Sequence, residues 1–342
     1  MFNIIKLNAL DNVAVASMNI PFGSIINSDL KAEDNIPYGH KISLKDINKK
    51  ELIYKYGQII GIATKDIKKG SHVHSHNLVF HEFSRSYKKN KISKISKYIK
   101  GKHFKGFLRK NGNVGTRNYI GLISTVNCSA TVVKKIADKL NKYLNENNFM
   151  NIDGAVCLKH SSGCGMNISG KGMNVFNRTI DGFKTHPNFG KVFVIGLGCE
   201  CAQISLYKNE NLNNEIEYLN IQDEGGTNSI INKVYKKIID EMHKLNLIER
   251  IDMPLSDLNL ALQCGGSDSY SGITANPALG IATDMLIQHG GSAILSETPE
   301  IYGAEHLLVE RTTEDKLINK LNDQISWWKK YTEINEGSLD NN

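Results

Sequence analysis

The chain has 342 residues, of which 40% are hydrophobic and 23% charged, so it can bury the cores of two or three ordinary globular domains. It lacks both an apolar run approaching the roughly 18 residues that span a bilayer and a typical secretory signal, and we therefore expect a cytoplasmic protein with no membrane partner. The formal net charge of +7 comes mainly from one lysine-rich segment, which argues against a nucleic-acid-binding protein.

The first 83 residues have the pattern of a small all-β domain. Short apolar runs alternate with turns rich in Gly, Asp, Asn and Pro. Near the end of this domain, His72, His74 and His76 occur at a spacing of two, so an extended strand would direct all three imidazoles to one face. Such a face suits a metal ion or an acid, and exposed histidines of an edge strand are the alternative.

Residues 84–105 interrupt this pattern. Eight lysines lie between Lys88 and Lys105, mixed with serine, asparagine and isolated isoleucines. This composition buries too little apolar surface to order the backbone. It predicts a solvated linker.

Residues 106–250 alternate strand and helix patterns. The expected strands cover residues 119–126, 154–158, 191–197 and 216–221. The third is nearly all apolar, so both of its faces are expected to be covered. The clearest helix runs from 227 to 245 with a buried stripe at helical spacing. Alternation of this kind predicts a parallel, doubly wound sheet.

Residues 251–342 predict an incomplete third α/β domain. A strand at 258–262 is followed by a Gly-rich turn and a helix that Asn276 caps and Pro277 begins. A second strand at 293–295 and a final helix around Trp327 follow. Two strands make a poor sheet with unpaired edges, so we expect that another polypeptide supplies the rest, that the domain oligomerises, or that the chain is a truncated or decayed product.

Four of the six cysteines follow the ends of predicted strands: Cys128, Cys164, Cys199 and Cys264. Parallel strands end at one edge of a sheet, so these thiols are expected to converge there. Convergent thiolates indicate iron, zinc or an iron–sulfur centre. A nucleophilic cysteine with His160 as its base, and purely structural thiols, are the alternatives.

Other polar residues flank these positions. Arg109, Arg117 and Asn118 surround a glycine turn, where arginines bind a substrate carboxylate or form surface ion pairs. Glu224 precedes the long helix, as a general base or as an acid that stabilises the helix N-terminus. A dinucleotide fingerprint, a phosphate-binding P-loop and a GxSxG nucleophile elbow are all missing from the sequence.

Taken together, these motifs resemble the altronate dehydratase and galactarate dehydratase family of sugar-acid hydro-lyases. The resemblance covers about residues 11–328. It rests on runs such as DNVAVA, KYGQIIGIATKDIKKG, VHSHN, GNVGTRNY, HSSGCGM, GLGCE, QDEGGT, LQCGGSDSYSGITANPALG and ILSETPEIYGAEHLL.

The resemblance implies an N-terminal SAF-type (β-clip) domain ahead of α/β domains. It also implies dehydration of a hexonate or hexarate to a 2-keto-3-deoxy sugar acid. The implied cofactor is a divalent metal, with Fe²⁺ as the first choice and Mn²⁺ or an iron–sulfur centre as alternatives. Family members continue for more than a hundred residues beyond the point where this chain stops, so we expect weak or absent activity from the chain alone. A sulfolactate-type lyase subunit and a noncatalytic carboxylate-binding or scaffold subunit are the alternative functions.

Position at strand ends and turns then assigns hypothetical roles within this family. The expected metal ligands are the four cysteines named above. The expected acids and bases are His160, Glu224, Glu297 and His306. The expected substrate-binding residues are Lys55, His74, His76, Arg109, Arg117, Asn118, Ser267 and Asp268.

Overall fold

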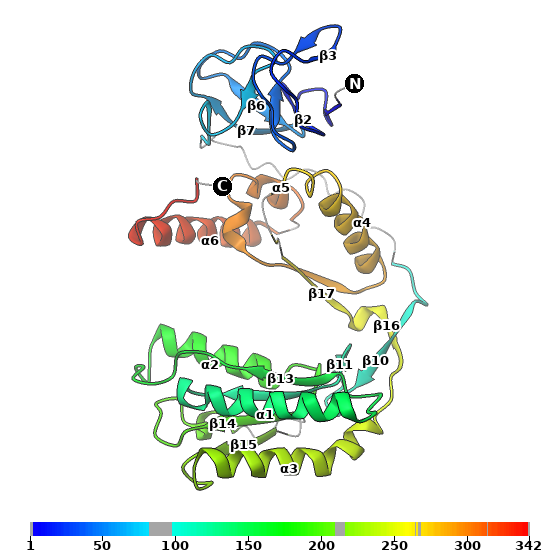
Figure 1. Ribbon diagram of the computed structural model, residues 1–342, viewed down its shortest axis with the longest axis vertical. Coiled ribbons are helices and arrows are strands. Elements are labelled where there is room, and N and C mark those ends of the chain that lie inside the picture. The colour runs from blue at the N-terminus through cyan, green and yellow to red at the C-terminus, as the bar shows by residue number, and fades with distance from the viewer. Residues whose placement is uncertain are drawn as a thin grey trace. The chain divides into compact units, whose positions relative to one another are not determined.

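A computed structural model describes residues 3–81, 98–208, 216–263, 265, 268–312 and 314–340. The chain forms two compact units (Figure 1). Unit 1 comprises residues 1–98, 259–288 and 293–342, and unit 2 comprises residues 99–258 and 289–292. No helix in these described ranges is long and apolar enough to cross a membrane.

The first part of unit 1 is the all-β domain that the sequence predicts. Its strands form antiparallel sheets in the orders β1-β2-β5-β8, β6-β7-β9 and β3-β4. Val13 of β2 packs into one core, whereas Ala14 and Ala16 pack into a second. The strands are β1 (Ile4–Ile5), β2 (Val13–Ala16), β3 (Ile25–Asn27), β4 (Leu30–Lys31), β5 (Lys41–Ser43), β6 (Leu52–Lys55), β7 (Gln58–Ala63), β8 (His72–Val73) and β9 (Leu78–Val79).

The histidine segment is not the extended strand that we expected. Strand β8 ends at Val73, and a turn follows. The buried amide of Asn77 causes this, since its oxygen accepts the N–H of His74 at 2.9 Å and its nitrogen donates to the carbonyl of His72 at 2.9 Å. The turn nevertheless keeps the histidines together.

The predicted linker also requires a correction. Residues 84–97 lie outside the described residues, but strand β10 (His103–Leu108) begins inside the segment that we expected to be solvated. It pairs antiparallel with β16 (Ile251–Pro254) and with β11 (Val114–Gly115). Residues 251–254, predicted as the start of the last domain, therefore belong to unit 2.

The core of unit 2 is a four-stranded parallel sheet in the order β13-β12-β14-β15. Helices α1 and α3 pack on one face with Phe193 and Ile195, while α2 packs on the other with Val192 and Val194. The alternation along β14 explains why its sequence is apolar throughout. The bounds are β12 (Tyr119–Ser124), α1 (Asn127–Glu146), β13 (Gly154–Leu158), α2 (Lys171–Lys184), β14 (Phe189–Gly196), η1 (Ile204–Tyr207), β15 (Ile216–Asn220) and α3 (Thr227–Asn246).

The remaining elements include a two-stranded sheet of β17 and β18. Helix α4 begins at Ala275, so the predicted N-cap at Asn276 is wrong. The backbone N–H of Thr274 already donates to the carbonyl of Tyr270, so the backbone turns helically before Asn276. Much of this region is exposed, with Ile281 at 63% and Ile294 at 59%. The elements are η2 (Leu255–Asp257), β17 (Asn259–Leu262), α4 (Ala275–Gln288), β18 (Ser292–Leu295), η3 (Thr298–Ile301), α5 (Glu305–Val309) and α6 (Asp315–Ile334).

Candidate functional site

The carboxyl edge of the parallel sheet in unit 2 gathers several of the predicted residues. Cys128 lies in the first turn of α1 after β12, and His160 and Cys164 follow β13. Cys199 follows β14, and Glu224 follows β15. Since the four strands are parallel, their carboxyl ends share the edge where α/β proteins bind ligands.

His160 connects two of these strand ends. Its Nδ1 accepts the backbone N–H of Ser162 at 3.1 Å, and its Nε2 lies 2.9 Å from the carbonyl oxygen of Ser124. A carbonyl only accepts, so Nε2 carries the proton and the ring is neutral. In this arrangement His160 holds the loop against the end of β12, and a role as proton acceptor would require Nδ1 to leave Ser162.

Glu200 is a buried carboxylate that we did not single out from the sequence. It is only 5% exposed. It accepts the hydroxyl of Thr125 at 2.8 Å and the backbone N–H groups of Leu197 and Gly198 at 3.1 and 2.7 Å. A Cβ at Gly196 would lie 2.3 Å from its Oε1, which explains the glycine there. The hydrogen bonds of Glu200 thus connect the end of β14 to the end of β12.

Glu224 forms an ion pair with Lys233 of α3. The Glu224 side chain is largely buried, and the Lys233 side chain is 55% exposed. Nearby, the amide of Asn220 donates to Asp223 at 2.9 Å. The sequence predicts either a base or a helix-stabilising acid at Glu224, and this pairing is compatible with both roles.

The thiols do not by themselves form the predicted metal centre. Cys128, Cys164 and Cys199 are free and exposed. Cys264 and Ser267 lie outside the described residues. Among the residues that are described, no group of three or more His, Cys, Asp or Glu is arranged to hold a metal ion. The thiol chemistry suits a soft metal, but the donor set is not assembled here, so metal binding stays a prediction.

Arg109 is directed into the fold. Its guanidinium donates to the carbonyl of Pro187 at 2.7 Å, to Oδ1 of Asn118 at 2.9 Å and to the carbonyl of Arg117 at 2.9 Å. Burial lowers its pKa to about 10. Arg117 forms an ion pair with Asp153 at 2.9 Å. These contacts fix the glycine turn at the amino end of β12 and favour structural roles for Arg109, Arg117 and Asn118 over substrate binding.

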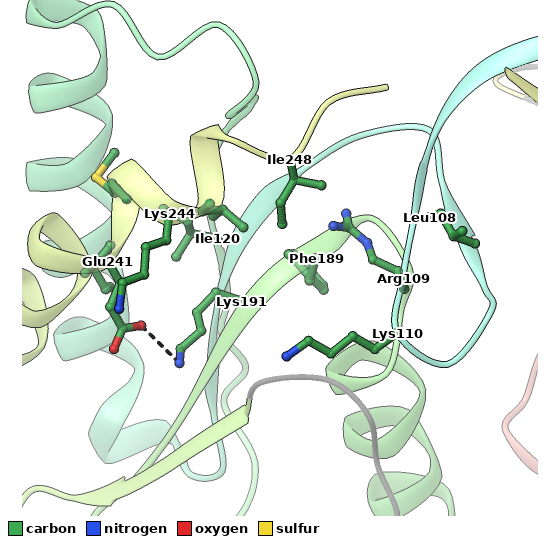
Figure 2. Close-up of a pocket in the computed structure, with 13 residues that line it drawn as sticks. Leu108, Arg109, Lys110, Ile120, Phe189, Lys191, Glu241, Lys244 and Ile248 are labelled. Carbon is green, nitrogen blue, oxygen red and sulfur yellow. Dashed lines mark ion pairs between the residues drawn. The ribbon is translucent and has the colours of Figure 1, made fainter. Parts of the chain in front are cut away.

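A cavity of about 310 Å³ lies at this amino end of the sheet, between α3 and the starts of β12 and β14 (Figure 2). Lys191 forms an ion pair with Glu241 at 3.0 Å on its wall. The lining residues are Leu108, Arg109, Lys110, Ile120, Phe189, Gly190, Lys191, Ile238, Glu241, Met242, Lys244, Leu245 and Ile248. None of the predicted catalytic residues lines it.

Basic side chains gather in the β-domain of unit 1, and we call them the basic cluster. The rings of His40 and His72 lie 5.1 Å apart, and those of His40 and His74 lie 4.9 Å apart. Desolvation, with a smaller contribution from the charge of Lys41, lowers the pKa of Lys55 to about 8. The basic cluster comprises His40, Lys41, Lys55, His72, His74 and His76.

The loop before α4 and the segment 297–306 contact the β-domain within unit 1. Nε2 of His306 lies 3.0 Å from Oε1 of Gln58 in β7. The Tyr56 hydroxyl donates to the carbonyl of Ser269 at 3.1 Å, and the ring of Tyr270 stacks on Tyr38 at 4.8 Å. These contacts join the second half of unit 1 to the β-domain.

Two predicted polar residues of unit 1 lie in these segments. Glu297 has a φ of 62°, a left-handed conformation, and its carboxylate accepts the amide of Gln263 at 3.3 Å. Asp268 accepts the N–H of Tyr270 at 3.0 Å, which shapes the loop before α4. Glu297 and His306 thus belong to unit 1, whereas His160 and Glu224 belong to unit 2.

Comparison with known proteins identifies the family. Residues 2–81 match the altronate/galactarate dehydratase SAF domain, residues 106–246 the second domain of D-galactarate dehydratase/altronate hydrolase, and residues 255–342 the C-terminal D-galactarate/altronate dehydratase domain. The altronate dehydratase of Bacillus subtilis is 33% identical over 97% of this chain. The chain belongs to the altronate/galactarate dehydratase family. The SAF match also agrees with the β-domain predicted from the sequence.

Two further relatives are similar to this chain over different lengths. The galactarate dehydratase (L-threo-forming) of Escherichia coli is 33% identical over 98% of this chain. The beta subunit of (2R)-sulfolactate sulfo-lyase from Chromohalobacter salexigens is 29% identical over 64% of it. The chain spans 67% of the Bacillus protein, 66% of the Escherichia coli protein and 52% of the sulfo-lyase subunit.

Proposed function

We propose that this chain takes part in removing water from a sugar acid of the altronate or galactarate type, giving a 2-keto-3-deoxy sugar acid in the cytoplasm. The observation that carries the proposal is similarity to named dehydratases along nearly the whole chain, through all three of their matched domains. Altronate and galactarate are both open-chain carboxylates, so a common site accepts either by its carboxylate and hydroxyl groups.

The reaction requires three things of the protein. It removes a weakly acidic proton next to a carboxylate, protonates the departing hydroxyl and stabilises the enediolate formed in between. Glu224 of unit 2 and Glu297 of unit 1 are two alternative carboxylates for proton removal. Nε2 of His306 lies 3.0 Å from the amide oxygen of Gln58, so Nε2 carries a hydrogen in this contact. The doubly protonated imidazolium is the form of His306 that protonates the departing hydroxyl in this proposal.

The basic cluster suits the substrate carboxylate. Lys55, His74 and His76 belong to it, and the substrate-binding role predicted for them from the sequence is part of this proposal. His160 and Glu200 act indirectly in this proposal: they fix the loops at the ends of β12, β13 and β14, which carry the thiols.

A divalent metal is part of the proposal and has its own test. Fe²⁺ is the first choice, with Mn²⁺ or an iron–sulfur centre as alternatives, because thiolates of Cys128, Cys164 and Cys199 favour soft or borderline metals. Such an ion supplies Lewis-acid stabilisation of a carboxylate and its neighbouring hydroxyl. Since the described residues do not assemble a donor set, we assign no reaction step to the metal.

We also propose that the chain works with further polypeptide, either a complementing C-terminal segment or a second copy. Helix α4 and strand β18 expose Ile281, Met285, Ile294 and Leu295, each more than half accessible. Exposed apolar surface of this kind favours association. The sulfo-lyase relative is named as one subunit of its enzyme.

The test is anaerobic purification with metal analysis, followed by assay of keto acid from altronate, galactarate and sulfolactate. Each assay is run on the chain alone and on the chain co-expressed with the C-terminal third of the Bacillus relative. We expect turnover of a sugar acid by the completed assembly. An assembly that contains stoichiometric metal and turns over neither sugar acid refutes the proposal.

Two other functions are outcomes of the same assays. Turnover of sulfolactate in preference to both sugar acids identifies a sulfolactate-type lyase, which the lower identity and coverage of that relative make less favoured. Carboxylate binding without any turnover identifies a noncatalytic binding subunit.

A further inference from the structure

Four imidazoles come together in the β-domain from three places in the sequence. His40 immediately precedes β5, His72 begins β8, and His74 and His76 lie in the following turn. Besides the contacts of His40, the rings of His72 and His76 lie 5.3 Å apart, and those of His72 and His74 lie 5.6 Å apart. Pairing of β5 with β8 brings these segments together, with Ile42 opposite His72.

The contact between His40 and His72 constrains their protons. Nδ1 of His40 lies 2.9 Å from Nε2 of His72, so one nitrogen donates a hydrogen and the other accepts it. Protonation of both rings would point two N–H groups at each other.

Lysines extend this arrangement. The charge of Lys41 lowers the pKa of both His74 and Lys55, after the larger effect of desolvation on each. Desolvation, followed by the charge of His40, lowers the pKa of His72 to about 4. The basic cluster is thus one connected set of groups that repel one another's positive charge.

Two carboxylates partly offset that charge, and both are held by backbone N–H groups. Asp34 accepts the N–H of His72 at 2.9 Å, and Asp11 accepts the N–H of Gly57 at 2.7 Å. Asp34 raises the pKa of His72 and Asp11 raises that of Lys55, but each is the smallest influence on its partner. At pH 7 the positive charge beside these two acids comes from Lys41 and Lys55, while His72 is neutral and able to gain a proton.

We infer that His40, Lys41 and His72 join Lys55 and His74 in a carboxylate-binding site, and that occupation of this site takes up protons. The inference rests on the proposed function in one respect, because the proposed function identifies the ligand as a sugar acid. An anion relieves the mutual repulsion of the cluster, and proton uptake is the measurable consequence.

The direction of the pH effect follows from linkage. A bound carboxylate raises the pKa of each basic group near it. His72, with a pKa of about 4 in the free protein, is neutral at pH 7 and gains a proton once the bound anion raises that pKa far enough. Lys55, with a pKa of about 8, loses charge in the free protein as pH rises through 8, so affinity falls from there upward.

The experiment is calorimetric titration of the full chain with galactarate at pH 7 in two buffers of different ionisation enthalpy. We expect net proton uptake, together with an association constant that falls by up to about tenfold per pH unit and per linked proton above pH 8. Galactitol, which has the same hydroxyl pattern without carboxylates, should show neither binding nor uptake.

Substitutions locate the effect. Lys55→Arg keeps the charge at high pH, so it should bind galactarate and remove the contribution of Lys55 to the decline above pH 8. His72→Gln should reduce the proton uptake at pH 7. Lys65→Gln, a change to an exposed lysine of the same domain, should leave both quantities unchanged. Thermal unfolding of each variant checks that the domain remains folded.

Proton release on galactarate binding, instead of proton uptake, overturns the inference. So does a chain that binds stoichiometric Zn²⁺ and no galactarate, if His72→Gln abolishes the Zn²⁺ binding. Unchanged uptake and pH dependence in folded His72→Gln and Lys55→Arg also overturn it. Failure of the proposed function can be told apart from failure of this inference. Galactarate binding with proton uptake, but no keto acid from the completed assembly, refutes the dehydratase activity alone. Turnover without proton uptake refutes the carboxylate site alone.

Discussion

Replacement of Glu200 tests whether one buried carboxylate organises the carboxyl edge of the parallel sheet. In Glu200→Ala, the hydroxyl of Thr125 and the N–H groups of Leu197 and Gly198 lose their acceptor. Each unsatisfied buried group costs ~1–3 kcal/mol, so three would cost up to ~9 kcal/mol before water enters. With partial relaxation we expect a loss of ~3–5 kcal/mol in the free energy of unfolding of unit 2.

Glu200→Gln should cost less. The amide oxygen still accepts from Thr125 and Leu197, but the amide nitrogen then faces the N–H of Gly198, and the lost charge-assisted bond is worth ~1.5–3 kcal/mol. Glu249→Ala removes an exposed carboxylate of the same unit and should change stability by less than ~0.5 kcal/mol.

Urea unfolding followed by two signals measures these changes. Both tryptophans of the chain, Trp327 and Trp328, lie in α6 of unit 1, so their fluorescence reports on that unit, whereas circular dichroism reports on both. For a slope of ~2 kcal/mol per M, Glu200→Ala should lower the dichroism midpoint of unit 2 by about 2 M and leave the fluorescence midpoint nearly unchanged. Equal midpoints for Glu200→Ala and Glu249→Ala would refute the role assigned to Glu200.

Three more substitutions test other parts of the structure. Gly196→Ala places a Cβ 2.3 Å from the Glu200 carboxylate and should destabilise unit 2 by ~1–3 kcal/mol in the same urea titration; an unchanged midpoint would contradict this close approach. Asn77→Ala removes both hydrogen bonds that shape the histidine turn and should weaken galactarate binding, measured by calorimetry, more than Lys65→Gln does. Cys264→Ala should abolish stoichiometric iron in anaerobic metal analysis, and retained iron removes Cys264 from the ligand set.

Local patterns predict much of the fold. The apolar run of β14 and the stripe of α3 indicate their elements and their burial directly, since period and hydrophobicity are properties of adjacent residues. Strand ends then place Cys128, Cys164 and Cys199 at one edge without any knowledge of distances. Strand β10 is different, because its lysines suggest a solvated segment, and its pairing partner at Ile251–Pro254 is about 150 residues further along the chain.

The candidate site is less predictable for the same reason. The guanidinium of Arg109 donates a hydrogen bond to the carbonyl of Pro187, which lies 78 residues further along the sequence. His40 meets His72 only because β5 pairs with β8. The burial of Glu200 depends on Thr125, which lies 75 residues earlier. In each case the chemistry of the residue is visible in the sequence, but its partner is set by tertiary structure.

The pairing of β10 with β16 has a consequence for how the gene can be divided. His103 lies opposite Pro254 in this ribbon, and neighbouring antiparallel strands are about 5 Å apart, so residues 99–258, the larger of the two segments of unit 2, begin and end close together. A short glycine-rich bridge from residue 98 to residue 259 should therefore reconnect unit 1 without unit 2. Residues 99–258 can equally be excised as one continuous cassette, transplanted between family members, or opened at a surface turn and circularly permuted.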